Sequence, residues 1–172
     1  MRELDSLGDL LGLPRPRLAF FPDRDEGERI YAQDRLARGE LDGLAGSFFA
    51  LTRECQSPDG LAARRLVLVP DAVITRREIS ERFAEFGFKR VDMVENVGEF
   101  ALRGQVVDCF GAAHAAPIRV LFRGDTVETL RLFDPISQES EGFLSEALIL
   151  PVNGGQGGDL GAYLGQCSVV YE

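Results

Sequence analysis

Apolar and polar residues alternate along the middle of this chain. Residues 118–133 alternate on either side of Arg123-Gly124-Asp125, which is a tight-turn signal. A second alternating pair, residues 99–102 and 106–110, flanks a turn at Arg103-Gly104. A period of two is typical of strands that rest one face on a core. The pattern therefore predicts an antiparallel meander.

One helix is predicted just before this meander. Thr75-Arg76-Arg77-Glu78 has the spacing of a capping box, in which a threonine and a glutamate side chain satisfy free backbone N–H groups at the helix start. Ile79, Phe83 and Phe86 then recur at helical intervals and share one face. Gly87 stands where a glycine commonly ends a helix. We expect this helix to lie against the meander.

The two ends of the chain predict α/β structure. The elements expected there are strands at 17–21, 66–70 and 147–152, a surface helix at 23–38 that ends before Gly39, a strand end and a short helix capped by Ser47 within 44–55, a turn at 56–60, and a helix end followed by a strand within 162–172. The glycine-rich segment 153–158 lacks the spacing of a phosphate-binding loop and has no cation nearby, which favours a flexible connector.

Composition excludes several classes of protein. The chain is 45% hydrophobic and 27% charged, as expected of a folded globular protein, and no apolar run approaches the roughly 20 residues that span a bilayer. The net charge of −9 opposes nonspecific binding to nucleic acid. Lys89 is the only lysine and lies in GFKRVD, so the sequence contains no P-loop.

The three cysteines, Cys55, Cys109 and Cys167, are widely spaced among apolar neighbours. Buried free thiols are favoured over a disulfide or a metal site. The N-terminal residues also lack the features of a secretion signal. Together these observations predict a cytoplasmic protein.

Other candidate chemistry is weak. Four carboxylates, on Asp92, Glu95, Glu99 and Asp108, suggest a metal-dependent hydrolase only if they converge, and solvated or hairpin-pairing roles are favoured instead. His114 lies in a loop of small residues without a serine or cysteine partner motif, so a surface histidine is favoured over a catalytic triad.

Residues 66–139 resemble a known family. The segments GFKRVDMVENVGEFALRGQVVDCF and PIRVLFRGDTVETLRLFDPISQES are similar to the UvrA-binding domain shared by UvrB and the transcription-repair coupling factor. The order, the spacing and the closing FDPISQ are more similar to the coupling factor. The flanking segments AGSFFALTRECQSP and LGAYLGQCSVVYE resemble that protein more weakly.

The resemblance implies an α/β (α+β) fold in three segments. Residues 1–65 and 143–172 would form a truncated, degenerate ATPase-like α/β domain, and residues 66–142 the inserted UvrA-interaction domain. It also implies a noncatalytic module without cofactors that recruits UvrA in nucleotide excision repair. In a full-length coupling factor, RNA polymerase and duplex DNA would bind through regions outside this chain, and no membrane partner is expected.

By position, Arg90 and Arg103 match arginines that contact UvrA in this family. Phe100 lies in the same hairpin, where it is either an aromatic anchor for the partner or, by strand alternation, a core residue. Lys89 and Glu99 are second-rank members of the same surface. The alternative hypothesis is that the same arginine-containing hairpin binds DNA directly, which predicts a steep dependence of affinity on salt.

Overall fold

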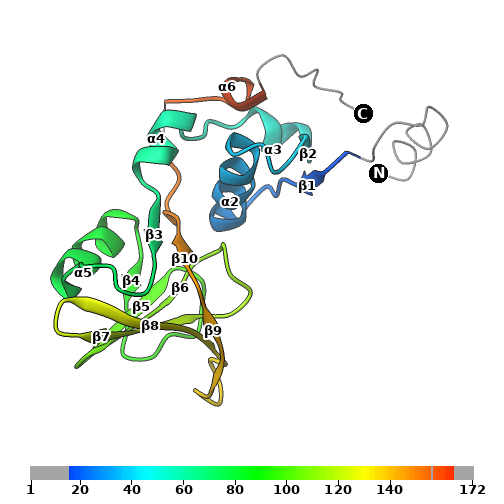
Figure 1. Cartoon of the computed structure of the whole chain (residues 1–172). Coiled ribbons are helices and arrows are strands. Elements are labelled where there is room, and N and C mark those ends of the chain that lie inside the picture. Colours follow the sequence, from blue (N-terminus) through cyan, green and yellow to red (C-terminus); the bar gives the residue numbers. More distant parts are fainter. Residues whose placement is uncertain (1–15, 156, 165–172) are drawn as a thin grey trace.

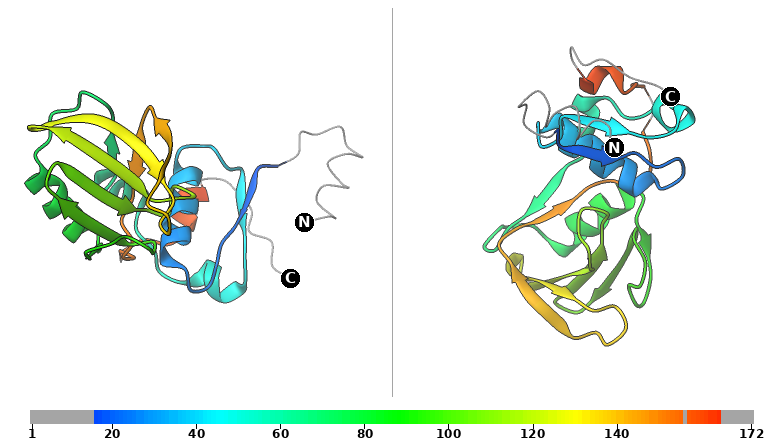
Figure 2. Two further views of the ribbon diagram at one scale, coloured as in Figure 1. Left: turned by 90° about the horizontal axis from the view of Figure 1, so that it is seen from below. Right: turned by 90° about the vertical axis from the view of Figure 1, so that its right-hand side faces the viewer.

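The computed structural model describes residues 16–155 and 157–164, which form two parts (Figure 1). One part is a six-stranded sheet with one helix packed on it, and the other gathers the remaining described helices around a two-stranded sheet. Strands β3 (Leu66–Leu68) and β10 (Ala147–Ile149) pair antiparallel and run side by side between the two parts (Figure 2).

The six strands follow one another in sequence order across the sheet. All neighbours are antiparallel except the first pair, which is parallel. The strands are β4 (Lys89–Arg90), β5 (Glu99–Arg103), β6 (Val106–Phe110), β7 (Ile118–Arg123), β8 (Thr126–Phe133) and β9 (Ser140–Leu144). The predicted meander and the α+β class are confirmed. The edge strands β4 and β9 were not predicted.

Helix α5 (Arg76–Glu85) covers one face of this sheet. Thr75 and Glu78 form both halves of the capping box, and Gly87 follows the helix with a positive φ of 85°. The buried ring of Phe83 stacks on Phe88 at 5.2 Å and meets Phe100 edge-on at 5.4 Å between ring centroids. The predicted helix and its end are therefore confirmed, and its apolar face forms the main core.

The second part begins as a parallel strand–helix–strand unit. Strands β1 (Leu18–Phe20) and β2 (Gly43–Ala45) pair in parallel through α2 (Glu26–Ala37), and α3 (Phe48–Thr52) follows with Ser47 as its N-cap. These elements were predicted, but the expectation of a surface helix at 23–38 is wrong, because α2 buries seven of its residues, among them Arg29, Ile30 and Leu36. The expected turn at 56–60 is wrong, because Ser57 caps a further helix, α4 (Pro58–Ala63), with proline in its first turn.

The described tail contains α6 (Gly161–Leu164), and the strand expected after it lies outside the described residues. The glycine-rich segment before α6 is more than a flexible connector. The backbones of Gly158 and Cys55 exchange two hydrogen bonds of 3.0 Å, and a Cβ on Gly158 would lie 2.8 Å from the backbone nitrogen of Ser57. Glycine is needed there because the two backbones approach so closely.

Cys55 and Cys109 are buried free thiols, as predicted, and Cys167 lies outside the described residues. Burial raises the pKa of the Cys55 thiol to about 11, so it stays protonated at neutral pH. Among the described helices, none is long and apolar enough to cross a membrane.

Replacing Phe83 by alanine should lower the free energy of unfolding by roughly 3 to 5 kcal/mol, because a fully buried ring is removed from between two other rings. Urea unfolding followed by circular dichroism measures the change. Ile136→Ala, at a side chain that is 92% exposed, is the matched control and should stay within about 0.5 kcal/mol of the wild type. Equal losses in both variants would contradict this assignment of the core.

Candidate interaction surface

Strand β5 divides its side chains between the two faces of the sheet. Phe100 and Leu102 belong to the core under α5, so the alternating residues Ala101 and Arg103 face the other way. We call this second side the open face. The register carries it across the sheet, because Ala101 pairs with Asp108, Asp108 with Arg119, and Arg119 with Arg131.

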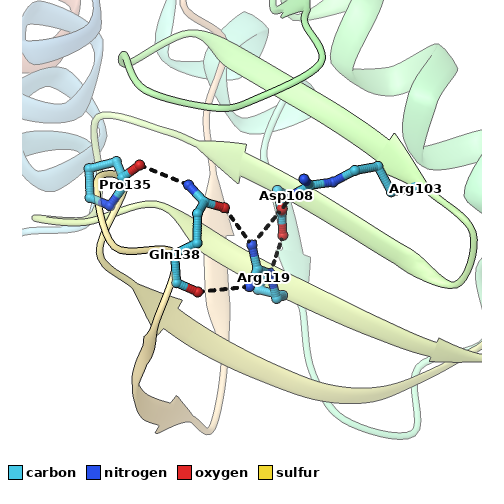
Figure 3. A network of polar contacts seen from close by, with 5 residues as sticks. All are labelled: Arg103, Asp108, Arg119, Pro135 and Gln138. Carbon is cyan, nitrogen blue, oxygen red and sulfur yellow. Dashed lines mark hydrogen bonds and ion pairs between the residues drawn. The ribbon is translucent and has the colours of Figure 1, made fainter.

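A buried carboxylate lies at the centre of the open face. The side chain of Asp108 is 1% exposed and accepts hydrogen bonds from two arginines (Figure 3). Arg119 donates from Nε to Oδ1 at 2.8 Å and from Nη2 to Oδ2 at 2.9 Å, and Arg103 donates from Nη2 to Oδ2 at 2.5 Å. A buried charge requires such partners, because burying it unpaired is strongly unfavourable.

Gln138 holds Arg119 from the opposite side. Its backbone carbonyl accepts from Arg119 Nη1 at 3.2 Å, and its Oε1 accepts from Nη2 at 3.0 Å (Figure 3). Gln138 Nε2 in turn donates to the carbonyl of Pro135 at 2.8 Å. The backbone of Gln138 is left-handed, with φ at 63°, a conformation that costs about 1 kcal/mol for a residue other than glycine.

The turn that contains Gln138 is organised by Asp134. Its Oδ1 accepts from the backbone nitrogens of Ile136 at 2.9 Å and Ser137 at 2.6 Å, and its backbone carbonyl accepts from the nitrogen of Gln138 at 2.8 Å. The two bonds to Oδ1, the one from Ser137 foremost, lower the pKa of the Asp134 carboxyl. The FDPISQ segment therefore forms a fixed turn that presents Gln138 to Arg119.

The two arginines that share Asp108 differ in what they can offer a partner. Arg119 makes four hydrogen bonds within the chain and lies 4.3 Å over the ring of Phe133, with 22% of its side chain exposed. Arg103 makes one side-chain hydrogen bond and is 47% exposed. Arg103 thus keeps most of its donors available, whereas Arg119 does not.

Strand β4 carries the other two predicted cations at the sheet edge. Lys89 pairs with Glu99 and Arg90 with Phe100, so Lys89 lies on the open face and Arg90 on the face of α5. Both side chains are exposed. Neither forms a hydrogen bond or ion pair with any residue that the structure describes. The predicted Arg90 and Arg103 therefore flank the same edge from opposite faces.

Glu99 is bound to its own loop. Its Oε2 accepts from the backbone nitrogens of Glu95 at 3.0 Å and Asn96 at 2.9 Å. These bonds, together with the positive charge of Lys89, lower the pKa of the Glu99 carboxyl against the effect of its partial burial. The side chain thus fixes the segment that joins β4 to β5.

Phe100 is a correction to the predicted surface. Its ring is 3% exposed and packs edge-on against Phe83, so it offers no aromatic anchor to a partner. The alternative that strand alternation directs it into the core is the one observed. Phe100 supports the surface only by fixing which residues of β5 face outward.

The remaining candidates have local structural roles. Within residues 16–155 and 157–164, no group of three or more histidine, cysteine or acidic side chains is placed to hold a metal ion. His114 is more than a solvated loop residue, because it is half-buried and its Nε2 accepts from the backbone nitrogen of Leu148 at 3.1 Å. Desolvation lowers its pKa. His114 thus ties the β6–β7 loop to β10.

Comparison with known proteins finds one family and two kinds of related protein. A model of the UvrB interaction domain family matches residues 66–154. The transcription-repair-coupling factor of Myxococcus xanthus is 37% identical over 128 residues, which cover 72% of this chain and 10% of that protein. The UvrABC system protein B of Haemophilus influenzae is 33% identical over 95 residues, which cover 55% of this chain and 14% of that protein. The chain thus spans about a tenth of the length of these relatives.

Replacing Glu99 by glutamine should lower the free energy of unfolding at pH 7, because the ionised carboxylate is the better acceptor for the two loop N–H groups. The folded pKa of Glu99 is depressed, so its stabilising effect is complete above the unfolded value of about 4.3 and is lost as the pH falls through the folded value. Urea unfolding at pH 7 and pH 3 measures the free energy of unfolding of both proteins. The difference between wild type and variant should become smaller at pH 3, and a difference that is independent of pH would contradict this role.

Proposed function

The chain belongs to the UvrB interaction domain family, and on that premise we propose that it is a docking module for UvrA in nucleotide excision repair. The similarity to transcription-repair-coupling factors supports a place in a protein of that kind. The observation that carries the proposal is a set of exposed cations, Lys89, Arg90 and Arg103, around one edge of the sheet in a chain whose net charge is −9.

Arginine suits this role for physical reasons. Its planar guanidinium pairs with a carboxylate through two parallel hydrogen bonds, and arginine is over-represented among the residues that dominate binding energy at interfaces. Since Arg90 and Arg103 flank the edge from opposite faces, the partner would contact both sides of the hairpin edge. Strand β4 is only two residues long and charged, which disfavours docking by addition of a further strand. Side chains, therefore, would make the contact.

We propose that the module acts by binding rather than by catalysis. Two of the four carboxylates considered for a metal site have other partners, since Glu99 accepts from its own loop and Asp108 from two arginines. Asp92 and Glu95 lie within that loop and are exposed. The geometry of the surface thus favours recognition of another protein.

The proposal also covers the division of the chain and its surroundings. Residues 66–142 would be the interaction domain, and residues 1–65 and 143–172 the flanking ATPase-like part in a cytoplasmic repair protein. The paired strands β3 and β10 are where the chain enters and leaves the sheet part, which supports an inserted domain that begins near residue 66. RNA polymerase and duplex DNA would bind a full-length protein elsewhere.

Titration of the chain against UvrA tests the proposal. Arg90→Ala and Arg103→Ala should each weaken binding by about 2 kcal/mol, roughly 30-fold, as is common for arginines at the centre of an interface. Isothermal titration calorimetry gives the affinities. The double variant should bind more weakly than either single variant.

The matched control is Arg77→Ala, which removes the same charge from the exposed surface of α5, where the side chain is 83% exposed. Its affinity should equal that of the wild type. Failure of the folded wild-type chain to bind UvrA would overturn the proposal. Binding to duplex DNA that falls steeply with salt and is lost in the double variant would instead establish direct DNA binding.

A further inference from the structure

We propose that Asp108 is a positioning residue for partner binding, whose buried carboxylate holds the Arg103 guanidinium in the orientation that receives an acidic group of the partner. The inference rests on the proposed docking function and extends it to residues that do not themselves face the partner. It assigns a role to Arg119, Gln138 and the FDPISQ turn, which the exposed cations alone leave unexplained.

The orientation of the Asp108 carboxylate is fixed from within the chain. Arg119 binds both of its oxygens, at 2.8 and 2.9 Å, so the carboxylate plane cannot turn without breaking that pair. The side chain is also almost completely buried, which removes water as a competing partner. The position of Asp108 Oδ2, which accepts from Arg103, is thus already fixed in the free chain.

Arg119 is held in the same way from its other side. Its guanidinium binds two acceptors of Gln138 and lies over the ring of Phe133, so it stays in place when Arg103 moves. Gln138 reaches Arg119 with its backbone carbonyl and its side chain together, from a left-handed position in the turn that Asp134 organises. The turn therefore orients Arg119, Arg119 orients Asp108, and Asp108 orients Arg103.

The arrangement suits recognition of a carboxylate. One carboxylate between two guanidinium groups leaves the local cluster with a net positive charge, and Arg103 still has unused donors at the surface. An arginine that is already ordered loses less conformational entropy when it binds than a free one. The ligand chemistry expected opposite Arg103 is hence an aspartate or glutamate side chain of the partner protein.

A double-mutant cycle against UvrA tests this role. Asp108→Asn keeps the shape of the side chain and removes its charge, and we expect it to weaken binding about tenfold in the wild-type background. In the Arg103→Ala background the same substitution should change affinity less than twofold, because its effect passes through Arg103. Unfolding in urea checks that both variants are folded under the conditions of the titration.

The outcomes separate the two proposals. If the folded wild-type chain does not bind UvrA, the docking function fails and this inference fails with it. If the wild type binds and Asp108→Asn loses affinity equally in both backgrounds, Asp108 has only a general structural effect and the inference is overturned. Unchanged or tighter binding by Asp108→Asn also overturns it, since Asp108 would then be irrelevant or would restrain Arg103 away from the partner.

A second variant keeps the test decisive if Asp108→Asn does not fold. Gln138→Gly removes the Oε1 acceptor of Arg119 while glycine accepts the left-handed backbone readily. We expect about threefold weaker binding that again disappears in the Arg103→Ala background. NMR relaxation of the Arg103 Nε–H group in the free chain should show more motion in this variant than in the wild type, and equal motion would overturn the inference.

Discussion

The alternation of side chains along β5 decides which residues this sheet offers to a partner. The core under α5 requires Phe100, whose ring packs against Phe83, and a strand that buries Phe100 must turn Ala101 and Arg103 to the other face. A slip of one residue in register would exchange the two sets. The aromatic core thus determines which arginine is available for binding, although no core residue faces a partner.

The open face combines a rigid centre with an accessible margin. At the centre, Asp108, Arg119 and Gln138 satisfy one another, and at the margin Arg103 and Lys89 remain exposed. Arg90 lies around the edge, on the face of α5. Three exposed cations, Lys89, Arg90 and Arg103, thus lie around one edge of the sheet in a chain whose net charge is −9.

Local sequence patterns predicted much of this fold. The capping box at Thr75, the helical spacing of Ile79 and Phe83 and the two turn signals in the meander each act over a few residues, so each could be recognised without the tertiary structure. Strand β4 was missed because two residues carry no periodicity, and it forms only by pairing with β5. Helix α4 was missed because its capped, proline-containing start also fits a turn.

The site was harder to predict than the fold. Arg90, Arg103 and Lys89 were predicted from the resemblance, and the structure shows that they are exposed. Phe100 remained undecided until its face of the sheet was known. Arg119 and Gln138 were not singled out, because their meeting with Asp108 requires the register of three strands and a left-handed turn. Nonlocal pairing of this kind leaves no short motif in a single sequence.

Hydrogen–deuterium exchange of the chain, measured with and without UvrA, shows whether the sheet edge is the docking surface. If it is, UvrA slows exchange in β4 and in the turn between β5 and β6, and exchange in α2 is unchanged. Protection confined to α2 and β1, with β4 and the β5–β6 turn unaffected by saturating UvrA, would contradict this assignment of the docking surface.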